Sequence, residues 1–109
     1  MATLQYNITS VAPAELLKRG DNVSNAKTIT LANVHASASA DVDLFIYDVA
    51  NNKSFHILKN VGIPHGTTLV LGSEDGISFN NSARGFSMRI QVDAGDGSTA
   101  VPVDVIIKQ

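Results

Sequence analysis

Hydrophobic and polar residues alternate along most of this chain, in short segments separated by Gly, Asn, Asp, Ser and Pro. A period of two places successive side chains on opposite faces of a β-strand, so each segment is expected to bury one of its faces. Short strands with turn residues between them are typical of β-sandwiches and β-barrels. The pattern therefore indicates an all-β fold before any single motif is considered.

The 109 residues fit one domain with one modest core. We expect a single antiparallel β-sandwich over residues 1–109, of the jelly-roll or immunoglobulin-like type, with about seven short strands. The expected strands span residues 3–10, 27–34, 41–48, 54–58, 67–71, 86–92 and 101–107. Two of them are expected to be central and to supply the core residues Met88, Ile90, Val103 and Val105.

Residues 12–19 predict one short helix after the first strand. A proline lies near its start, an acidic residue in its first turn and a glycine just beyond its end. Residues 51–52 and 93–98 have the composition of hairpin turns. Because Pro102 cannot donate a ladder hydrogen bond, one side of the last strand is predicted to be a sheet edge.

Charge and composition exclude several classes of partner. The net charge is -2 and charged residues make up 17% of the chain, so no basic surface for nucleic acid is expected. The chain has no cysteine, which excludes disulfides, thiolate metal sites and a cysteine nucleophile. Its first residues do not resemble a signal peptide, and no apolar run approaches the ~18 residues of a membrane span. We therefore expect no membrane partner and synthesis in a cytoplasm.

Several short motifs favour structural interpretations. Residues 19–21 match the Arg-Gly-Asp tripeptide that integrins read, but a glycine-capped turn accounts for the same residue types. Residues 93–97 lack the spacing and the closing Glu of a calcium loop, so a turn is expected. The histidines His35, His56 and His65 lie on separate segments without metal-ligand spacing. The sequence thus predicts no metal and no cofactor.

Catalytic constellations are not apparent in the sequence. It contains no Gly-x-Ser-x-Gly elbow and no glycine-rich phosphate loop. Asp41 and Asp43 are two residues apart on one strand face, and such a pair could serve as a general acid and a general base. On a solvated face neither pKa is expected to rise much, so these carboxylates are interpreted as solubilising charges. We expect that the chain is not an enzyme.

Two aromatic residues predict a surface for protein partners. If the even-numbered residues of 42–46 point into the core, Phe45 and Tyr47 lie on the opposite face together with Asp43. Large aromatics are the residues that interfaces favour. Alternatively, residues 12–19 fold over them, and the sequence leaves both arrangements open. Phe45, Tyr47 and Asp43 are the predicted interface residues.

The chain resembles small virion structural proteins of tailed bacteriophages, especially those of cyanophages, in three segments: residues 39–48, 55–64 and 66–71. In that family, small residues precede a Val-x-Leu-x-Ile alternation, and an Ile-Pro-x-Gly-Thr-Thr-Leu turn leads into the next strand. Residues 88–98 are similar to its late strand and hairpin. The resemblance extends over residues 29–107 and carries no catalytic residues.

The resemblance implies a virion structural protein that is made in the host cytoplasm. The expected role is a capsid decoration or cement protein that binds the shell as a homo-oligomer, with itself and the major capsid or tail proteins as partners. A neck, tail or fibre component is an alternative. A carbohydrate-binding or adhesion sandwich is another, and it would need an exposed aromatic platform from Phe45, Tyr47 and Phe55.

Overall fold

The computed structural model describes residues 3–18, 25–78 and 86–108, and these contain eight β-strands and no helix. The strands are β1 (Thr3–Ile8), β2 (Ala14–Leu17), β3 (Asn25–Asn33), β4 (Ala40–Asp48), β5 (Lys53–Ile63), β6 (Thr68–Ser78), β7 (Phe86–Asp93) and β8 (Val103–Lys108). The all-β expectation is confirmed for these residues, with eight strands in place of about seven.

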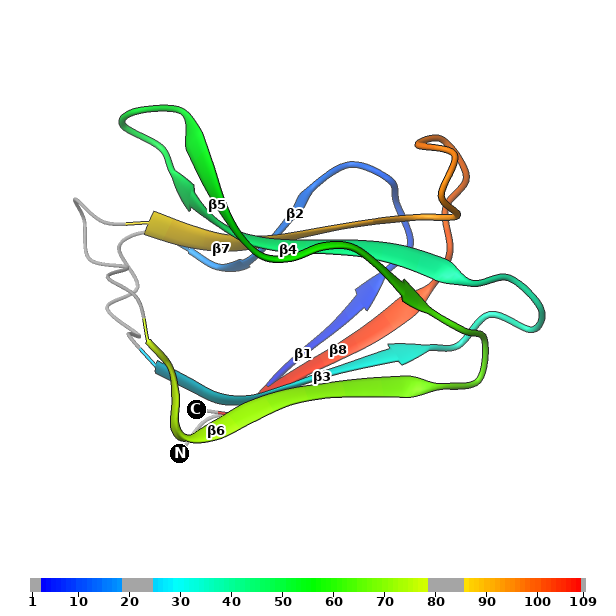
Figure 1. Cartoon of the computed structure of the whole chain (residues 1–109), viewed down its shortest axis with the longest axis horizontal. Helices are drawn as coiled ribbons and strands as arrows, with labels where there is room; N and C mark the ends of the chain where they lie inside the picture. Colours follow the sequence, from blue (N-terminus) through cyan, green and yellow to red (C-terminus); the bar gives the residue numbers. More distant parts are fainter. Residues whose placement is uncertain (1–2, 19–24, 79–85, 109) are drawn as a thin grey trace.

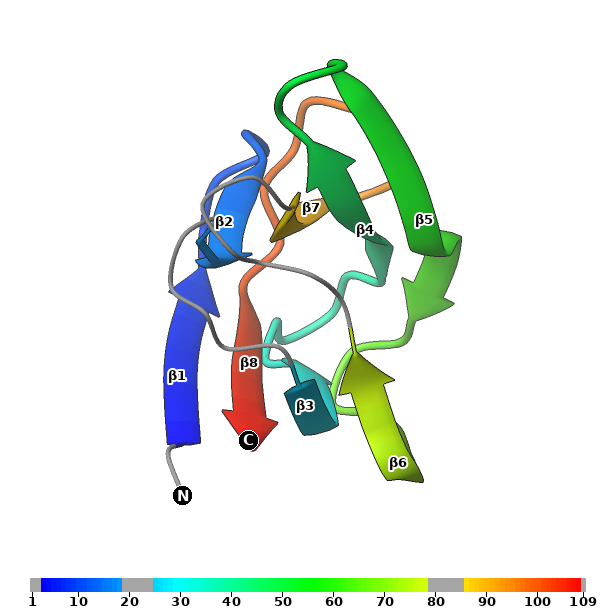
Figure 2. The same ribbon diagram turned by 90° about the vertical axis from the view of Figure 1, so that its left-hand side faces the viewer.

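The strands form two antiparallel sheets of four strands each, stacked as the two layers of a sandwich (Figure 1). The first sheet has the order β1-β8-β3-β6, and the second has the order β2-β7-β4-β5. Only the β4–β5 connection stays within a sheet, and every other connection crosses between the layers. Figure 2 shows the two sheets from the end of the sandwich. Nearly all pairings therefore join residues far apart in sequence.

The core lies between the sheets and is built mainly from alternate residues of the strands. Met88, Ile90 and Val92 of β7 and Val103, Val105 and Ile107 of β8 are all buried. Both strands are interior members of their sheets, which confirms the predicted central core residues. Burying one such aliphatic side chain contributes about 1.5–3 kcal/mol, so these two strands anchor the sandwich.

The helix expected over residues 12–19 is wrong, because residues 14–17 form strand β2 at the edge of the second sheet. Ala14 and Glu15 pair with β7, and the register then shifts by a bulge before Leu17. Leu16 and Leu17 are both buried, at 2% and 1% exposure. One or two helical turns are marginal in isolation, so pairing with β7 and burial of two consecutive leucines outweigh the helix signals.

Two turn predictions have different outcomes. The hairpin around residues 51–52 is confirmed, since β4 pairs with β5 and Asn52 adopts a positive φ of 53°. Residues 93–98 do form turns, but they connect β7 of the second sheet to β8 of the first and so do not close a hairpin.

The sheet edge predicted from Pro102 is also wrong: β8 begins one residue later and is an interior strand.

A buried asparagine fastens one end of the sandwich. Asn33, the last residue of β3, donates from Nδ2 to the carbonyl oxygens of Ala38 (2.9 Å) and Ile63 (2.8 Å). Its Oδ1 accepts from the backbone N–H of His35 at 2.9 Å. Three strand ends are thereby held by one satisfied side chain, which meets the requirement for burying a polar group.

Candidate interaction surface

The predicted interface residues lie on the outer surface of the second sheet, which we call the Phe45 face. It comprises Glu15, Asp41, Asp43, Phe45, Tyr47, Ser54, His56, Ser87, Arg89, Gln91 and Asp93. One row crosses all four strands, because Glu15 pairs with Arg89, Arg89 with Phe45, and Phe45 with His56. Sequence alternation thus placed Phe45 and Tyr47 on the side away from the core.

Phe45 is buried on this outer face, at 7% exposure, although it does not belong to the core cluster between the sheets. Its ring lies 5.2 Å from that of His56, with an interplanar angle of 41°. Such tilted aromatic pairs are favourable beyond the area they bury. Residues 14–17, within the segment that was an alternative cover for Phe45, do not lie over it, since they form β2 in the same sheet.

Tyr47 is half-buried, and both its ring and its hydroxyl have partners. The guanidinium carbon of Arg89 lies 4.2 Å from the ring centroid, a cation–π arrangement. Arg89 also forms an ion pair with Glu15 at 3.4 Å and donates from Nε to Ser87 Oγ at 3.1 Å. The Tyr47 hydroxyl donates to Oδ1 of Asn52 in the hairpin turn. These contacts link β2, β7, β4 and the β4–β5 turn.

Asp43 holds an irregular part of β5 in place. The β4–β5 register shifts on both sides of Leu44, and Asn60 has a positive φ of 53°. Asp43 Oδ1 accepts from the backbone N–H of Asn60 at 2.7 Å, and its Oδ2 lies 3.3 Å from Lys59 Nζ. Its side chain is 17% exposed. The predicted interface residue therefore has an intramolecular role in fixing a bulge.

Asp41 differs from the expectation of an ordinary solvated carboxylate. Burial, together with the nearby charges of Asp93 and Asp43, raises the pKa of Asp41, while Lys59 opposes the shift. Its Oδ1 is buried without a hydrogen-bond partner among the described residues. Ionising this group is therefore less favourable in the folded protein than in the unfolded chain, so the ionised carboxylate lowers the stability of the fold.

The acidic turn after β7 is stabilised by local hydrogen bonds. Asp93 Oδ1 accepts from the Gly95 N–H at 2.7 Å, and Asp96 accepts from the N–H groups of Ser98 and Thr99 at 2.9 Å each. The Thr99 hydroxyl also donates to Asp96, and these bonds lower the pKa of Asp96 to about 2. The sequence predicts a hairpin turn here; a turn is present, but it joins the two sheets and closes no hairpin.

The remaining motifs do not form a second site. No group of three or more His, Cys, Asp or Glu side chains in the described ranges could hold a metal ion. His35 instead accepts from the N–H groups of Ser37 and Ala38 through Nδ1. The Arg-Gly-Asp tripeptide at 19–21 lies outside the described residues. No helix long and apolar enough to cross a membrane occurs in the part of the chain that the structure describes.

The outer surface of the first sheet, which we call the Val70 face, was not singled out from the sequence. Its three transverse rows are Asn7, Asp104, Ala32 and Thr68; Gln5, Ile106, Thr30 and Val70; and Lys108, Thr28 and Gly72. The signal was available in β8: if Val103, Val105 and Ile107 point inward, alternation leaves Ile106 outside.

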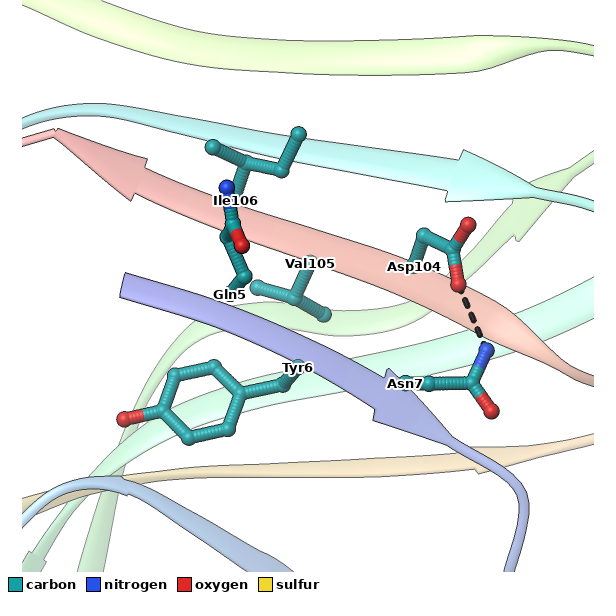
Figure 3. Close-up of a pocket in the computed structure, with 6 residues that line it drawn as sticks. All are labelled: Gln5, Tyr6, Asn7, Asp104, Val105 and Ile106. Atoms are coloured by element: carbon teal, nitrogen blue, oxygen red, sulfur yellow. Dashed lines mark hydrogen bonds between the residues drawn. The ribbon is translucent and has the colours of Figure 1, made fainter. Parts of the chain in front are cut away.

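A shallow hollow of about 400 Å³ lies on β1 and β8 at one side of the Val70 face (Figure 3). Gln5, Asn7, Asp104 and Ile106 line it, and Asn7 Nδ2 donates to Asp104 Oδ1 at 2.5 Å. Tyr6, which also lines the hollow, donates its hydroxyl to the Leu16 carbonyl. Asp104 is the single carboxylate in the lining, so this hollow does not bring together an acid–base pair.

Comparisons with known proteins give limited information. No protein-family model matches the chain, and no curated protein matches it. Among solved structures, the Yersinia pseudotuberculosis-derived mitogen is similar with a TM-score of 0.47 and 11% sequence identity. The match covers 98% of this chain and 83% of that chain. At this level of similarity, nothing about function is transferred to this chain.

Proposed function

We propose that the chain is a bacteriophage virion structural protein, a capsid decoration protein that binds the shell as a homo-oligomer. The observation that supports it most is the order of the strands. Sheets ordered β1-β8-β3-β6 and β2-β7-β4-β5 fit an eight-stranded jelly roll, whereas an immunoglobulin sandwich divides its strands differently. Viral capsid domains are among the proteins that use the jelly roll. The bacteriophage assignment itself rests on the sequence resemblance.

In this proposal the Phe45 face contacts the shell as a preorganised surface. Tyr47 and Arg89 are residue types that dominate binding energies, and here they are fixed by contacts with each other, Glu15 and Asn52. A surface already ordered before binding loses less side-chain entropy on association. Phe45 is buried on the same face and pairs with Arg89, and Asp43 fixes the adjoining bulge.

The proposal is tested by binding the purified chain to shells of the phage that encodes it. Tyr47→Ala should lower occupancy on the shell about tenfold or more, since it removes a hot-spot residue type. His65→Ala, an exposed substitution in the β5–β6 connection that belongs to neither face, is the matched control and should bind as the wild type does. Thermal unfolding of both variants separates binding from folding. Absence of the chain from purified virions would contradict the proposal.

The carbohydrate-binding alternative is not favoured by the aromatic residues it requires. Phe45 is buried, and the Tyr47 ring is stacked against Arg89. Phe55 is 48% exposed, but it lies beneath the Lys53 ammonium at 5.4 Å from its ring centroid. The three rings therefore do not offer the shared exposed platform on which a sugar would stack.

A further inference from the structure

The Val70 face exposes apolar side chains in register with one another. Val70 is 60% exposed and Ile106 is 38% exposed, and both pair with Thr30 from its two sides. The neighbouring row positions on β3 are Thr28 and Ala32. Single exposed apolar residues are ordinary on a protein surface, but here two of them lie in one row on either side of Thr30, and apolar residues that are grouped in this way favour an interaction surface.

The charges in these rows are arranged so that the face is complementary to itself. Asp104 and Lys108 lie on the same side of β8, one on each side of Ile106. Four residues along a strand correspond to a separation of about 13 Å. Consider two copies of this sheet stacked face to face, with a twofold axis that lies between them and runs parallel to the row of Val70, Thr30 and Ile106. This axis is perpendicular to the strands, so the strands of the second copy run in the opposite direction. Asp104 of each copy would then face Lys108 of the other.

We propose that the Val70 face binds a second copy of this chain, with the two sheets packed face to face and their β8 strands antiparallel. Residues on the axis meet their own equivalents, so Val70 faces Val70 and Ile106 faces Ile106 across the interface. Apolar side chains thereby meet apolar side chains, and each acidic group meets a basic one. The inference deepens the proposed function, because it names the surface that forms the homo-oligomer.

The size of the face is compatible with this role. The strands run along the longest dimension of the molecule, 40 Å, and the sheet is spanned by the shortest, 18 Å (Figure 1). Their product gives at most about 700 Å² on each copy, close to the ~800 Å² per partner of a standard interface. Threonine and alanine side chains on β3 are small enough for two sheets to approach to about 10 Å.

Charge reversal tests the inference on the full chain. Sedimentation equilibrium is measured for the wild type, Asp104→Lys, Lys108→Asp and the double variant carrying both changes. Each single change places like charges opposite each other and should raise the dimer dissociation constant about tenfold or more. The double variant restores opposite charges at both contacts and should recover most of the wild-type affinity. Val70→Lys should weaken the dimer by at least as much as either single change.

Two controls make the outcome decisive. Tyr47→Ala, on the other sheet, should leave the dissociation constant unchanged, and thermal unfolding should show that every variant folds. A wild-type chain that remains monomeric at all concentrations would overturn the inference. A double variant as weak as the single ones would also overturn it. Dimers that fail to bind the shell would instead contradict the proposed virion role, because dimerisation and shell binding are measured separately.

Discussion

The two outer faces of the sandwich use their side chains in opposite ways. On the Phe45 face, Phe45, Tyr47, Asp43 and Arg89 all have aromatic, ionic or hydrogen-bond partners within the chain. On the Val70 face, small and β-branched residues leave Val70 exposed and offer few intramolecular contacts to lose. An aromatic residue that faces away from the core can therefore contribute to folding, whereas a face with few internal contacts can be available for association with a second copy.

The largest expected effect compares Phe45 with Val70. Phe45→Ala should lower the free energy of unfolding by about 3 kcal/mol, because it removes a buried ring and its contact with His56. Val70→Ala should change it by less than ~1 kcal/mol, because that side chain is largely exposed. Urea denaturation at a concentration where the chain is monomeric measures both. Equal losses would remove the distinction between the faces.

A smaller effect is expected at Asp43. Asp43→Ala should destabilise the fold by about 1–2 kcal/mol, since the Asn60 N–H loses its acceptor at the bulge of β5. The matched control is Asp104→Ala, which removes a carboxylate bonded to an exposed Asn7 side chain and should cost less than ~0.5 kcal/mol. Denaturant midpoints, taken at a concentration where the chain is monomeric, measure the difference. A larger loss at Asp104 would contradict the structural role given to Asp43.

Asp41 should affect stability in the opposite direction. Its pKa is raised in the folded state, so it favours folding when protonated and opposes folding as the pH rises through the folded pKa. Asp41→Asn should therefore stabilise the protein at pH 7, and the gain should disappear below the ordinary value of 3.8. Unfolding curves from pH 3 to pH 7 follow this change. A stabilising effect that is independent of pH would exclude the titration of Asp41 as its cause.

The smallest effect is expected at Asp96, where the sign is reversed. A pKa lowered to about 2 means that the ionised group stabilises the fold, and this contribution is lost as the pH falls from 3.8 to about 2. Asp96→Asn should make the free energy of unfolding less dependent on pH in that window. At neutral pH the variant should lose the stabilisation that ionised Asp96 provides. If the variant and the wild type lose stability equally as the pH falls, the hydrogen bonds from Thr99 and Ser98 do not matter to stability.

Alternation along the sequence was sufficient to locate the core but not the contacts of the faces. It placed Met88, Ile90, Val103 and Val105 inside, because each strand carries its own period of two. It also placed Phe45 on the outer face. Its burial there depends on the register with His56 across the bulged β4–β5 hairpin and with Arg89, which is distant in sequence. Local patterns do not specify such pairings.

The errors have related causes. Residues 12–19 have the local signals of a helix, and pairing with β7 overrides them. The polar composition of residues 72–81 predicts a loop, in which Ile77 and Phe79 form a short strand or anchor the loop, yet β6 continues to Ser78, and Ile77 pairs with Ala26. Phe79 lies outside the described residues. Glycine and charged residues are tolerated in an edge strand, so composition alone was misleading there.

Chemical crosslinking tests the contrast between the faces most directly. The chain has no cysteine, so a single introduced thiol is unique. Thr30→Cys places it at the centre of the Val70 face, and Ser54→Cys places it on the Phe45 face as the matched control. With a bis-maleimide spanning about 10 Å, the face-to-face distance of packed sheets, Thr30→Cys should give covalent dimers and Ser54→Cys should not. Equal or greater yield from Ser54→Cys, or no dimer from Thr30→Cys, would contradict the account.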